Sequence, residues 1–141
     1  PMFSRPESRK NRWSLNDNYL RFWFRFIFPN QSLIEMGKYD LLREVIDRGY
    51  EQYSGLVLEK YFRSKIAEEE RITGIGSYWN NKGENEIDVI AINDLDKTAI
   101  VAEVKRNPKK IDMNILQSKV HSVKELAKYK VELQGLSLEN M

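Results

Sequence analysis

Two apolar segments joined by a polar turn dominate the pattern in the second half of the chain. Residues 87–92 and 98–104 are rich in Val, Ile and Ala, which is typical of buried strands. Residues 93–97 supply the Asn and Asp side chains of a turn. Four charged residues interrupt or flank the two strands: Glu86, Asp88, Glu103 and Lys105. Charged groups in buried strands need a partner, so these four residues are candidates for a functional site.

The spacing of these charges predicts that two carboxylates face each other. If the hairpin turns between residues 95 and 96, Asp88 pairs with Glu103, and Glu86 pairs with Lys105. Directly opposed side chains share a face, with Cβ atoms about 4.5–5.5 Å apart. Two carboxylates at that distance need a cation between them, and a divalent metal with oxygen ligands meets the need. A register shift of one residue would separate the two carboxylates. The alternative is a solvated face with a simple Glu86–Lys105 pair.

An aromatic helix is predicted near the start of the chain. Asn16 or Asp17 begins a helix that continues YLRFWFRFIF and stops at Pro29. Arg21 and Arg25 form its only polar stripe. It is shorter than the ~18 apolar residues of a membrane span, so we expect it to be buried against the domain or against a partner domain. A platform for nucleic-acid bases is the alternative.

A short amphipathic turn or helix is predicted next, over residues 40–46, and a second amphipathic helix over residues 53–66. The apolar face of the second contains Leu56, Phe62 and Ile66. Glu59 falls on this face, where a carboxylate needs a partner, unless the helix is rotated so that Glu59 lies at its edge. Residues 71–81 then predict a strand with a glycine bend or bulge, and residues 80–83 a turn into the hairpin.

A basic loop, a helix and a strand follow the hairpin. The loop contains Arg106, Lys109 and Lys110, and it leaves the hairpin beside the acidic residues, where a phosphate backbone would lie. A solvated loop is the alternative. Residues 111–128 predict an amphipathic helix with Gln117 at the edge of its apolar stripe, and residues 131–138 predict a closing strand. The apolar stripe consists of Leu116, Val120, Val123 and Ala127.

Composition excludes several kinds of site. The 141 residues are enough for one compact domain with a buried core. The absence of cysteine and the single histidine, His121, exclude thiolate metal sites and zinc sites built on several histidines. A net charge of +2 gives no global attraction to nucleic acid. The chain contains no GxxxxGK[ST] phosphate loop.

The two ends of the chain carry no targeting signal that we can identify, and we expect a cytoplasmic protein. The opening Pro1-Met2 indicates a fragment of a longer protein. Residues 1–11, with Arg5, Arg9 and Lys10, predict a solvated linker, with a phosphate-contacting arm as the alternative.

The predicted order of helix, three strands, helix and strand resembles the core of the PD-(D/E)XK nuclease superfamily. The residues that carry the resemblance are Glu59, Asp88 and the triplet Glu103-Val104-Lys105. The resemblance implies a restriction-endonuclease-like α/β fold in which a mixed sheet is flanked by helices. It implies that Asp88 and Glu103 bind Mg²⁺ or Mn²⁺. Lys105 would then orient or activate water, and Glu59 would complete the catalytic set. Ile87 stands where the family name has proline, which is not a ligand.

Nearly the whole chain also resembles a domain of unknown function found C-terminal to archaeal-type AAA ATPase modules. The matching segments are NDNYLRFWFRFIFPN, YSGLVLEKYF, GSYWN, GENEIDVIAI and AEVK, in that order. The resemblance implies an ATPase part N-terminal to this chain. We therefore expect residues 1–40 to form a linker and aromatic helix, and residues 41–141 to form the nuclease-like domain.

Three functional hypotheses remain open at this point. The first is Mg²⁺-dependent hydrolysis of phosphodiester bonds in nucleic acid. The second is a catalytically inactive nuclease-fold module that serves docking, homodimerisation or regulation of the ATPase. The third is binding of nucleic acid without cleavage. Under the first and third, the expected contacts to nucleic acid are Arg106, Lys109, Lys110 and Gln117. No membrane partner is expected.

Overall fold

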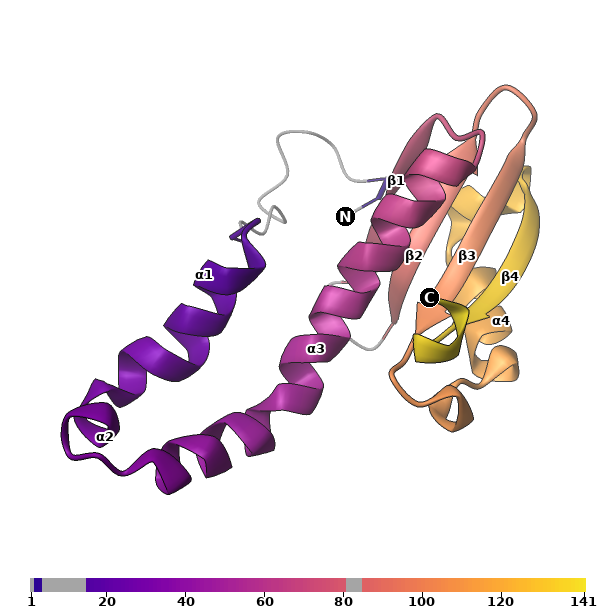
Figure 1. Cartoon of the computed structure of the whole chain (residues 1–141). Coiled ribbons are helices and arrows are strands. Elements are labelled where there is room, and N and C mark those ends of the chain that lie inside the picture. The colour runs from indigo at the N-terminus through magenta and orange to yellow at the C-terminus, as the bar shows by residue number, and fades with distance from the viewer. Residues whose placement is uncertain (1, 4–14, 81–84) are drawn as a thin grey trace. The chain divides into compact units, whose positions relative to one another are not determined.

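The computed structural model describes residues 2–3, 15–80 and 85–141 (Figure 1). The chain divides into two compact units: the helical unit, residues 12–57, and the sheet unit, residues 1–11 and 58–141. The domain boundary predicted from the sequence falls between residues 40 and 41, whereas the units divide within a helix, between residues 57 and 58. The basic residues of the predicted N-terminal arm and the predicted turn residues 81–83 lie outside the described residues.

The aromatic segment of the helical unit starts where the sequence predicts. Asp17 caps helix α1 (Asn18–Phe22), because its side chain accepts a hydrogen bond from the Leu20 N–H at 2.9 Å. The predicted stop at Pro29 is wrong. Pro29 lies in the first turn of a 3-10 segment, where its missing N–H costs no helical hydrogen bond. The segments after α1 are a π-helical turn Trp23–Ile27, a 3-10 turn Phe28–Asn30 and helix α2 (Gln31–Glu35).

The aromatic segment is only partly buried. Phe26 is 3% exposed and packs edge-on against Tyr53, with ring centroids 5.7 Å apart. In contrast, Tyr19, Phe24 and Phe28 are 68%, 50% and 55% exposed. The prediction that this segment is buried against the domain is therefore wrong for three of its six aromatic residues, and burial against a partner domain stays a prediction. Apart from the stripe of Arg21 and Arg25, the segment is apolar on nearly all sides, whereas its packing partner covers only one side.

A single helix, α3 (Tyr39–Glu69), replaces the two helices predicted over residues 40–46 and 53–66. Gly49 lies inside α3, although glycine is disfavoured in a helix interior. The reason is close packing: a Cβ atom on Gly49 would lie 2.6 Å from Cε1 of Phe26. Neither α3 nor any other helix of the described residues is long and apolar enough to cross a membrane.

One mixed four-stranded sheet forms the centre of the sheet unit within the described residues (Figure 1). Its strands are β1 (Gly74–Trp79), β2 (Glu86–Asn93), β3 (Thr98–Val104) and β4 (Lys130–Leu136), in that order across the sheet. Neighbouring strands run antiparallel, except that β3 and β4 are parallel. The predicted order of helix, three strands, helix and strand, and the predicted mixed α/β class, are confirmed.

The register of the β2–β3 hairpin follows the sequence prediction. Asn93 pairs with Thr98 and Val89 pairs with Ala102, as a turn between residues 95 and 96 requires. The Asn93 side-chain oxygen accepts hydrogen bonds from two backbone N–H groups of the turn, at 2.9 and 3.0 Å. The observed pairs run from Asn93–Thr98 to Val89–Ala102, and the same register extended by one residue sets residue 88 beside residue 103.

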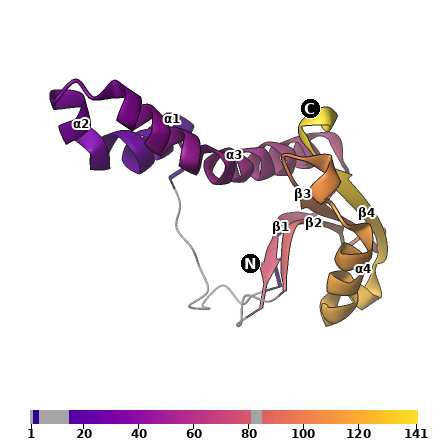
Figure 2. The ribbon, with the colours of Figure 1, turned by 90° about the horizontal axis from the view of Figure 1, so that it is seen from below.

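Helices cover both faces of the sheet, as Figure 2 shows for α3 and α4. The C-terminal half of α3 packs Leu58, Phe62 and Ile66 on one face. Helix α4 (Met113–Ser122) packs Leu116 on the other face. The helix predicted over residues 111–128 ends early, because Val123 is extended and buried, and a 3-10 turn (Lys124–Lys128) follows.

Candidate functional site

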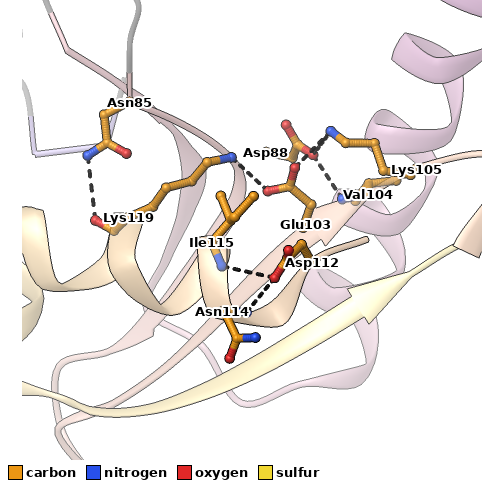
Figure 3. A network of polar contacts seen from close by, with 9 residues as sticks. All are labelled: Asn85, Asp88, Glu103, Val104, Lys105, Asp112, Asn114, Ile115 and Lys119. Carbon is orange, nitrogen blue, oxygen red and sulfur yellow. Dashed lines mark hydrogen bonds and ion pairs between the residues drawn. The ribbon is translucent and has the colours of Figure 1, made fainter. Parts of the chain in front are cut away.

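The ammonium of Lys105 joins two of the predicted acidic residues at one end of the sheet (Figure 3). Its Nζ lies 2.9 Å from Oε1 of Glu103 and 3.4 Å from Oδ2 of Asp88. The side chains of Asp88 and Glu103 are each only 11% exposed. Of the four charged residues predicted in the hairpin, Asp88, Glu103 and Lys105 therefore form one cluster, in which Lys105 contacts both carboxylates. The alternative of a simple Glu86–Lys105 pair is wrong for the lysine, because Lys105 bridges the carboxylates of Asp88 and Glu103. Glu86 is exposed.

Asp88 lies in an irregularity of the sheet. Along β1, Gly76 and Tyr78 are two residues apart, yet their partners on β2 are Ile90 and Ile87, which are three apart. One extra residue on β2 is a β-bulge, which re-aims a side chain locally. The Asp88 carboxylate accepts a hydrogen bond from the Val104 N–H, at 2.8 Å. A bend or bulge was expected in the glycine-containing strand 71–81, but the extra residue lies on its partner β2, where Asp88 is part of the bulge.

A second lysine, which the sequence analysis did not identify, contacts Glu103. Lys119 on α4 places its Nζ 3.0 Å from Oε2 of Glu103, and its side chain is 22% exposed. The helical spacing could have predicted the side of the helix on which Lys119 lies, although not its partner. Lys119 follows the buried Leu116 by three residues and precedes the buried Val123 by four, so it lies on the side of the helix that faces the sheet.

Several polar contacts fix α4 beside the site (Figure 3). Asp112 caps the helix, because its Oδ1 accepts hydrogen bonds from the N–H groups of Asn114 and Ile115, at 2.9 and 3.2 Å. The Asn85 amide donates to the Lys119 carbonyl, at 3.5 Å, and also contacts the Ser122 hydroxyl. These contacts anchor the turn of α4 from which the Lys119 side chain reaches Glu103.

Glu59, the fourth residue of the set that the family resemblance implies, lies on α3, which packs on the other face of the sheet from α4. Burial raises the pKa of Glu59 to about 7, and the negative charge of Asp88 adds to the rise. Lys105 and Arg63 act against it. Glu59, half-buried on α3, therefore lies within electrostatic range of Asp88 and Lys105, although no hydrogen bond joins it to either among the described contacts. Leu56, predicted on the apolar face, is 41% exposed, and Leu58 is buried instead beside Phe62 and Ile66. The helix is therefore rotated relative to the predicted face, and half-buried Glu59 lies at the edge of the buried stripe.

The lysines keep Glu103 ionised. Burial alone would raise the pKa of this carboxyl group, but hydrogen bonds from Lys105 and Lys119 outweigh it and hold the pKa below its usual value. Burial likewise disfavours the charged form of Lys105, but Glu103 and Asp88 raise the pKa of its ammonium above the usual value. Glu103 is therefore a carboxylate and Lys105 an ammonium at neutral pH, whereas Glu59, with a pKa of about 7, is close to half-protonated.

The residues predicted to contact nucleic acid lie in two places. Lys109 and Lys110 are exposed on the 3-10 turn Pro108–Lys110, which follows β3 and Lys105 in the chain. Arg106 is half-buried. Gln117 is exposed on α4 and lines a separate pocket of about 500 Å³. None of the predicted catalytic residues, Glu59, Asp88, Glu103 and Lys105, lines this pocket. Gln117 is thus not grouped with the acidic cluster.

The chemistry of the cluster can be compared with the needs of a divalent cation. Within the described residues, no three His, Cys, Asp or Glu side chains are arranged to hold a metal ion. Two carboxylates, Asp88 and Glu103, nevertheless converge on one cationic atom, the Lys105 Nζ. Carboxylate oxygens are the ligands that Mg²⁺ and Mn²⁺ prefer, and Mg²⁺ is commonly held by one or two carboxylates with water and phosphate oxygens. The donor set therefore fits a two-carboxylate site.

Comparison with known proteins places the cluster inside a matched region. The sequence model of DUF234, archaeal and bacterial proteins of unknown function, matches residues 23–119, a range that includes Glu59, the Asp88–Glu103 pair and both lysines. An uncharacterized protein of Methanocaldococcus jannaschii is 38% identical over 143 residues, covering 92% of this chain and 32% of the relative. The chain thus spans about a third of the length of that relative. No solved structure matches the chain.

Proposed function

The chain belongs to the DUF234 family of archaeal and bacterial proteins of unknown function, and from its acidic cluster we propose that it is a metal-dependent nuclease module. The proposed reaction is hydrolysis of a phosphodiester bond in nucleic acid. The proposed fold assignment is the PD-(D/E)XK type, for which the order of helix, three strands, helix and strand is the support. The observation that carries the proposal is the Lys105 Nζ, which contacts both Asp88 and Glu103.

Asp88 and Glu103 are the residues that would hold Mg²⁺ or Mn²⁺. A divalent ion supplies Lewis-acid polarisation of a phosphoryl oxygen and lowers the pKa of a coordinated water. The buried setting of the two carboxylates favours this role, because each side chain is largely removed from competing bulk water. Hydrogen bonds from Lys105 and Lys119 lower the pKa of Glu103 and so keep its carboxylate deprotonated, as a metal ligand must be.

Lys105 is the residue proposed to stabilise negative charge on the reacting phosphate. Burial lowers the pKa of Lys105, but its carboxylate neighbours Glu103 and Asp88 raise it by more, so Lys105 stays protonated at neutral pH. A protonated lysine is a hydrogen-bond donor and a positive charge, which suits it to stabilising an oxyanion rather than removing a proton. Glu59, with a pKa of about 7, is the group of the cluster best matched to accept or donate a proton near neutrality.

The basic loop after Lys105 is proposed to contact the nucleic-acid backbone. Lys109 and Lys110 are exposed and lie within five residues of the candidate catalytic lysine. Phosphate contacts from lysine position a nucleic acid without reading its sequence. This arrangement predicts binding that weakens with salt, because each phosphate contact releases a counterion.

Calorimetry with Mn²⁺ and Mg²⁺ tests the metal site. The wild type is compared with Asp88→Asn and Asp88→Ala, and with Asp47→Asn as a control, since Asp47 is exposed and belongs to the helical unit. We expect the wild type and the control to bind one ion and both Asp88 variants to lose binding while retaining the wild-type circular dichroism. Cleavage of labelled single-stranded and duplex DNA, and of RNA, is then measured with the same proteins. Wild-type metal affinity in Asp88→Ala would refute the assignment.

A second candidate function, docking without catalysis, is favoured by the exposed aromatic residues of the helical unit. Tyr19, Phe24 and Phe28 are each at least 50% exposed. Exposed apolar patches of this kind mark protein-binding sites. The proposed partners are a second copy of the chain or an ATPase part of a longer protein. Light scattering of the wild type beside Phe24→Ser and Phe28→Ser tests self-association: a wild-type dimer that becomes a monomer in both variants supports it, and a wild-type monomer opposes dimerisation.

A further inference from the structure

Arg63 joins helix α3 to the segment of β2 that carries Asp88. Its Nη2 donates a hydrogen bond to the Asp88 backbone carbonyl, at 3.0 Å. Arg63 lies one helical turn after Glu59 on α3, and its positive charge acts on the Glu59 carboxyl group. The guanidinium therefore contacts or influences two residues of the acidic cluster, although the residue itself contributes no metal ligand.

The carbonyl that Arg63 contacts belongs to the β-bulge. Asp88 and Val89 of β2 together lie opposite the single residue Ser77 of β1, between the pairs Gly76–Ile90 and Tyr78–Ile87. A bulge disrupts the backbone ladder, and buried backbone groups near it need other partners. Arg63 supplies such a partner. The guanidinium thereby fixes the backbone of the bulge at Asp88, and the backbone conformation sets the direction of the Asp88 side chain.

A second hydrogen bond fixes the other end of the same residue. The Val104 N–H donates to Oδ2 of Asp88, at 2.8 Å, beyond the Val89–Ala102 pair with which the β2–β3 pairing begins. The position of Asp88 is thus set by one bond to its carbonyl, from α3, and one to its carboxylate, from β3. A change at either bond should be transmitted to the other through the Asp88 residue.

Arg63 is poorly suited to a purely structural role. Its Nε atom is buried and has no hydrogen-bond acceptor among the residues that the structure describes. An unpaired buried donor lowers stability, so a residue selected only for packing would more favourably be apolar. What the arginine provides at this place is its Nη2 contact to the bulge.

We propose that Arg63 is a positioning residue, which holds the bulge so that the Asp88 carboxylate can share a cation with Glu103. The cation-sharing part of this inference rests on the proposed function. The positioning itself does not, because it rests on the two hydrogen bonds that Asp88 makes with Arg63 and Val104. The two parts can therefore be tested separately.

Amide hydrogen exchange of the whole chain, measured by NMR without metal, tests the positioning. The variants are Arg63→Gln and the conservative Arg63→Lys, with Arg71→Gln as the control, since Arg71 is an exposed arginine of the same unit at the opposite end of β2. In Arg63→Gln we expect the Val104 amide to exchange roughly tenfold faster, as for one lost hydrogen bond, while the core amide of Val101 is unchanged. Arg63→Lys should restore part of the protection.

Mn²⁺ calorimetry on the same proteins tests the consequence for the site. We expect Arg63→Gln to bind Mn²⁺ about 10- to 100-fold more weakly than the wild type, as is typical when an outer-shell partner is removed. Arg63→Lys should lie between them, and Arg71→Gln should match the wild type. If the wild type binds no Mn²⁺, the proposed function fails, and the exchange data alone decide the role of Arg63. Unchanged Val104 exchange in Arg63→Gln would overturn the inference, and so would an equal loss of protection at Val101 and Val104.

Discussion

Lys119 Nζ lies 3.0 Å from Oε2 of Glu103, so helix α4 supplies a second ammonium to a carboxylate that already contacts Lys105 through its other oxygen. Each oxygen of this largely buried carboxylate thus has its own cationic donor. Charge-assisted hydrogen bonds of this kind are stronger than neutral ones. The contact links the helix on one face of the sheet to the residue proposed as a metal ligand.

The first prediction concerns Lys119→Met, which keeps the length of the side chain and removes its charge. We expect the free energy of unfolding at pH 7 to fall by about 1–3 kcal/mol, because a hydrogen bond to a charged, buried group is lost. Urea denaturation at several pH values measures it. Lys124→Met is the control, since Lys124 is exposed. An equal effect of the two variants would contradict the role assigned to Lys119.

The pH dependence of this effect has a defined sign. The pKa of Glu103 is lowered in the folded protein, so its pairing stabilises the fold above the usual pKa of 4.5 and is lost as the pH falls through the lowered value. The stability difference between the wild type and Lys119→Met should therefore be largest at neutral pH and shrink below about pH 4. A difference that grew on acidification would contradict the assignment.

The second prediction concerns Glu59→Gln, and its sign is opposite. Burial, followed by the charge of Asp88, raises the pKa of Glu59 from 4.5 to about 7, so the folded chain binds an extra proton between these values. Its contribution to stability is thus present at pH 4.5 and is lost as the pH rises through 7. We expect Glu59→Gln to be about 1–2 kcal/mol more stable than the wild type at pH 8, allowing for solvent screening. Glu68→Gln, an exposed change on the same helix, should have no such effect.

Denaturation at pH 5 and pH 8 separates these outcomes. The difference between Glu59→Gln and the wild type should be small at pH 5 and larger at pH 8. A variant that is less stable than the wild type at pH 8 would show that the Glu59 carboxylate is well stabilised by its neighbours, and that burial does not dominate its environment.

The third prediction concerns Lys105→Met and depends on the proposed metal site. The Lys105 ammonium competes with a divalent cation for the same two carboxylates. Its removal should therefore raise the affinity for Mn²⁺ roughly three- to tenfold, about 1 kcal/mol for a repulsion screened by solvent, while any cleavage is lost. Lys109→Met should leave the Mn²⁺ affinity unchanged, since Lys109 is exposed on the loop. Weaker Mn²⁺ binding in Lys105→Met would show that the lysine supports the metal ligands instead of competing with an ion.

The hairpin and its charges could be predicted because short-range chemistry determines them. The turn residues Asn93 to Lys97 fix the loop length, and strand alternation then fixes which positions are opposed. That arithmetic places residue 88 beside residue 103, and the observed register agrees from residue 89 onward. The partner of Lys105 differs from the prediction. The hairpin register predicts Glu86 opposite Lys105, whereas the flexible Lys105 side chain contacts the buried carboxylates of Asp88 and Glu103.

The features that were missed depend on contacts between distant parts of the chain. The helices predicted over residues 40–46 and 53–66 are one continuous helix. The Gly49 between them lies where the Phe26 ring leaves no room for a side chain. Lys119 was missed because its partner lies 16 residues earlier, on a strand. Arg63 reaches a backbone carbonyl that only the bulge places near it. Apolar periodicity describes one element at a time and does not determine these pairings.

The last prediction uses two glycines of the same helix as a matched pair. Replacing a helix-interior glycine by alanine ordinarily stabilises a protein by roughly 0.5–1 kcal/mol. Gly55 has nothing within 4 Å of the position of a Cβ, so Gly55→Ala should show this gain. A Cβ on Gly49 would lie 2.6 Å from the Phe26 ring, which is buried and packed against Tyr53. Gly49→Ala should therefore lower stability by about 1–3 kcal/mol, as overpacking does.

Denaturation followed by circular dichroism at 222 nm measures both variants, since helix α3 contains both glycines. The double variant Gly49→Ala with Phe26→Leu provides the decisive comparison, because a smaller side chain at residue 26 removes the ring that the new methyl group would strike. We expect Gly49→Ala to be less destabilising, relative to its own parent, in the Phe26→Leu background than in the wild type. Equal stabilisation by both alanines in the wild-type background would show that Phe26 does not hold the two helical segments at the observed distance, and that Gly49 is kept for another reason.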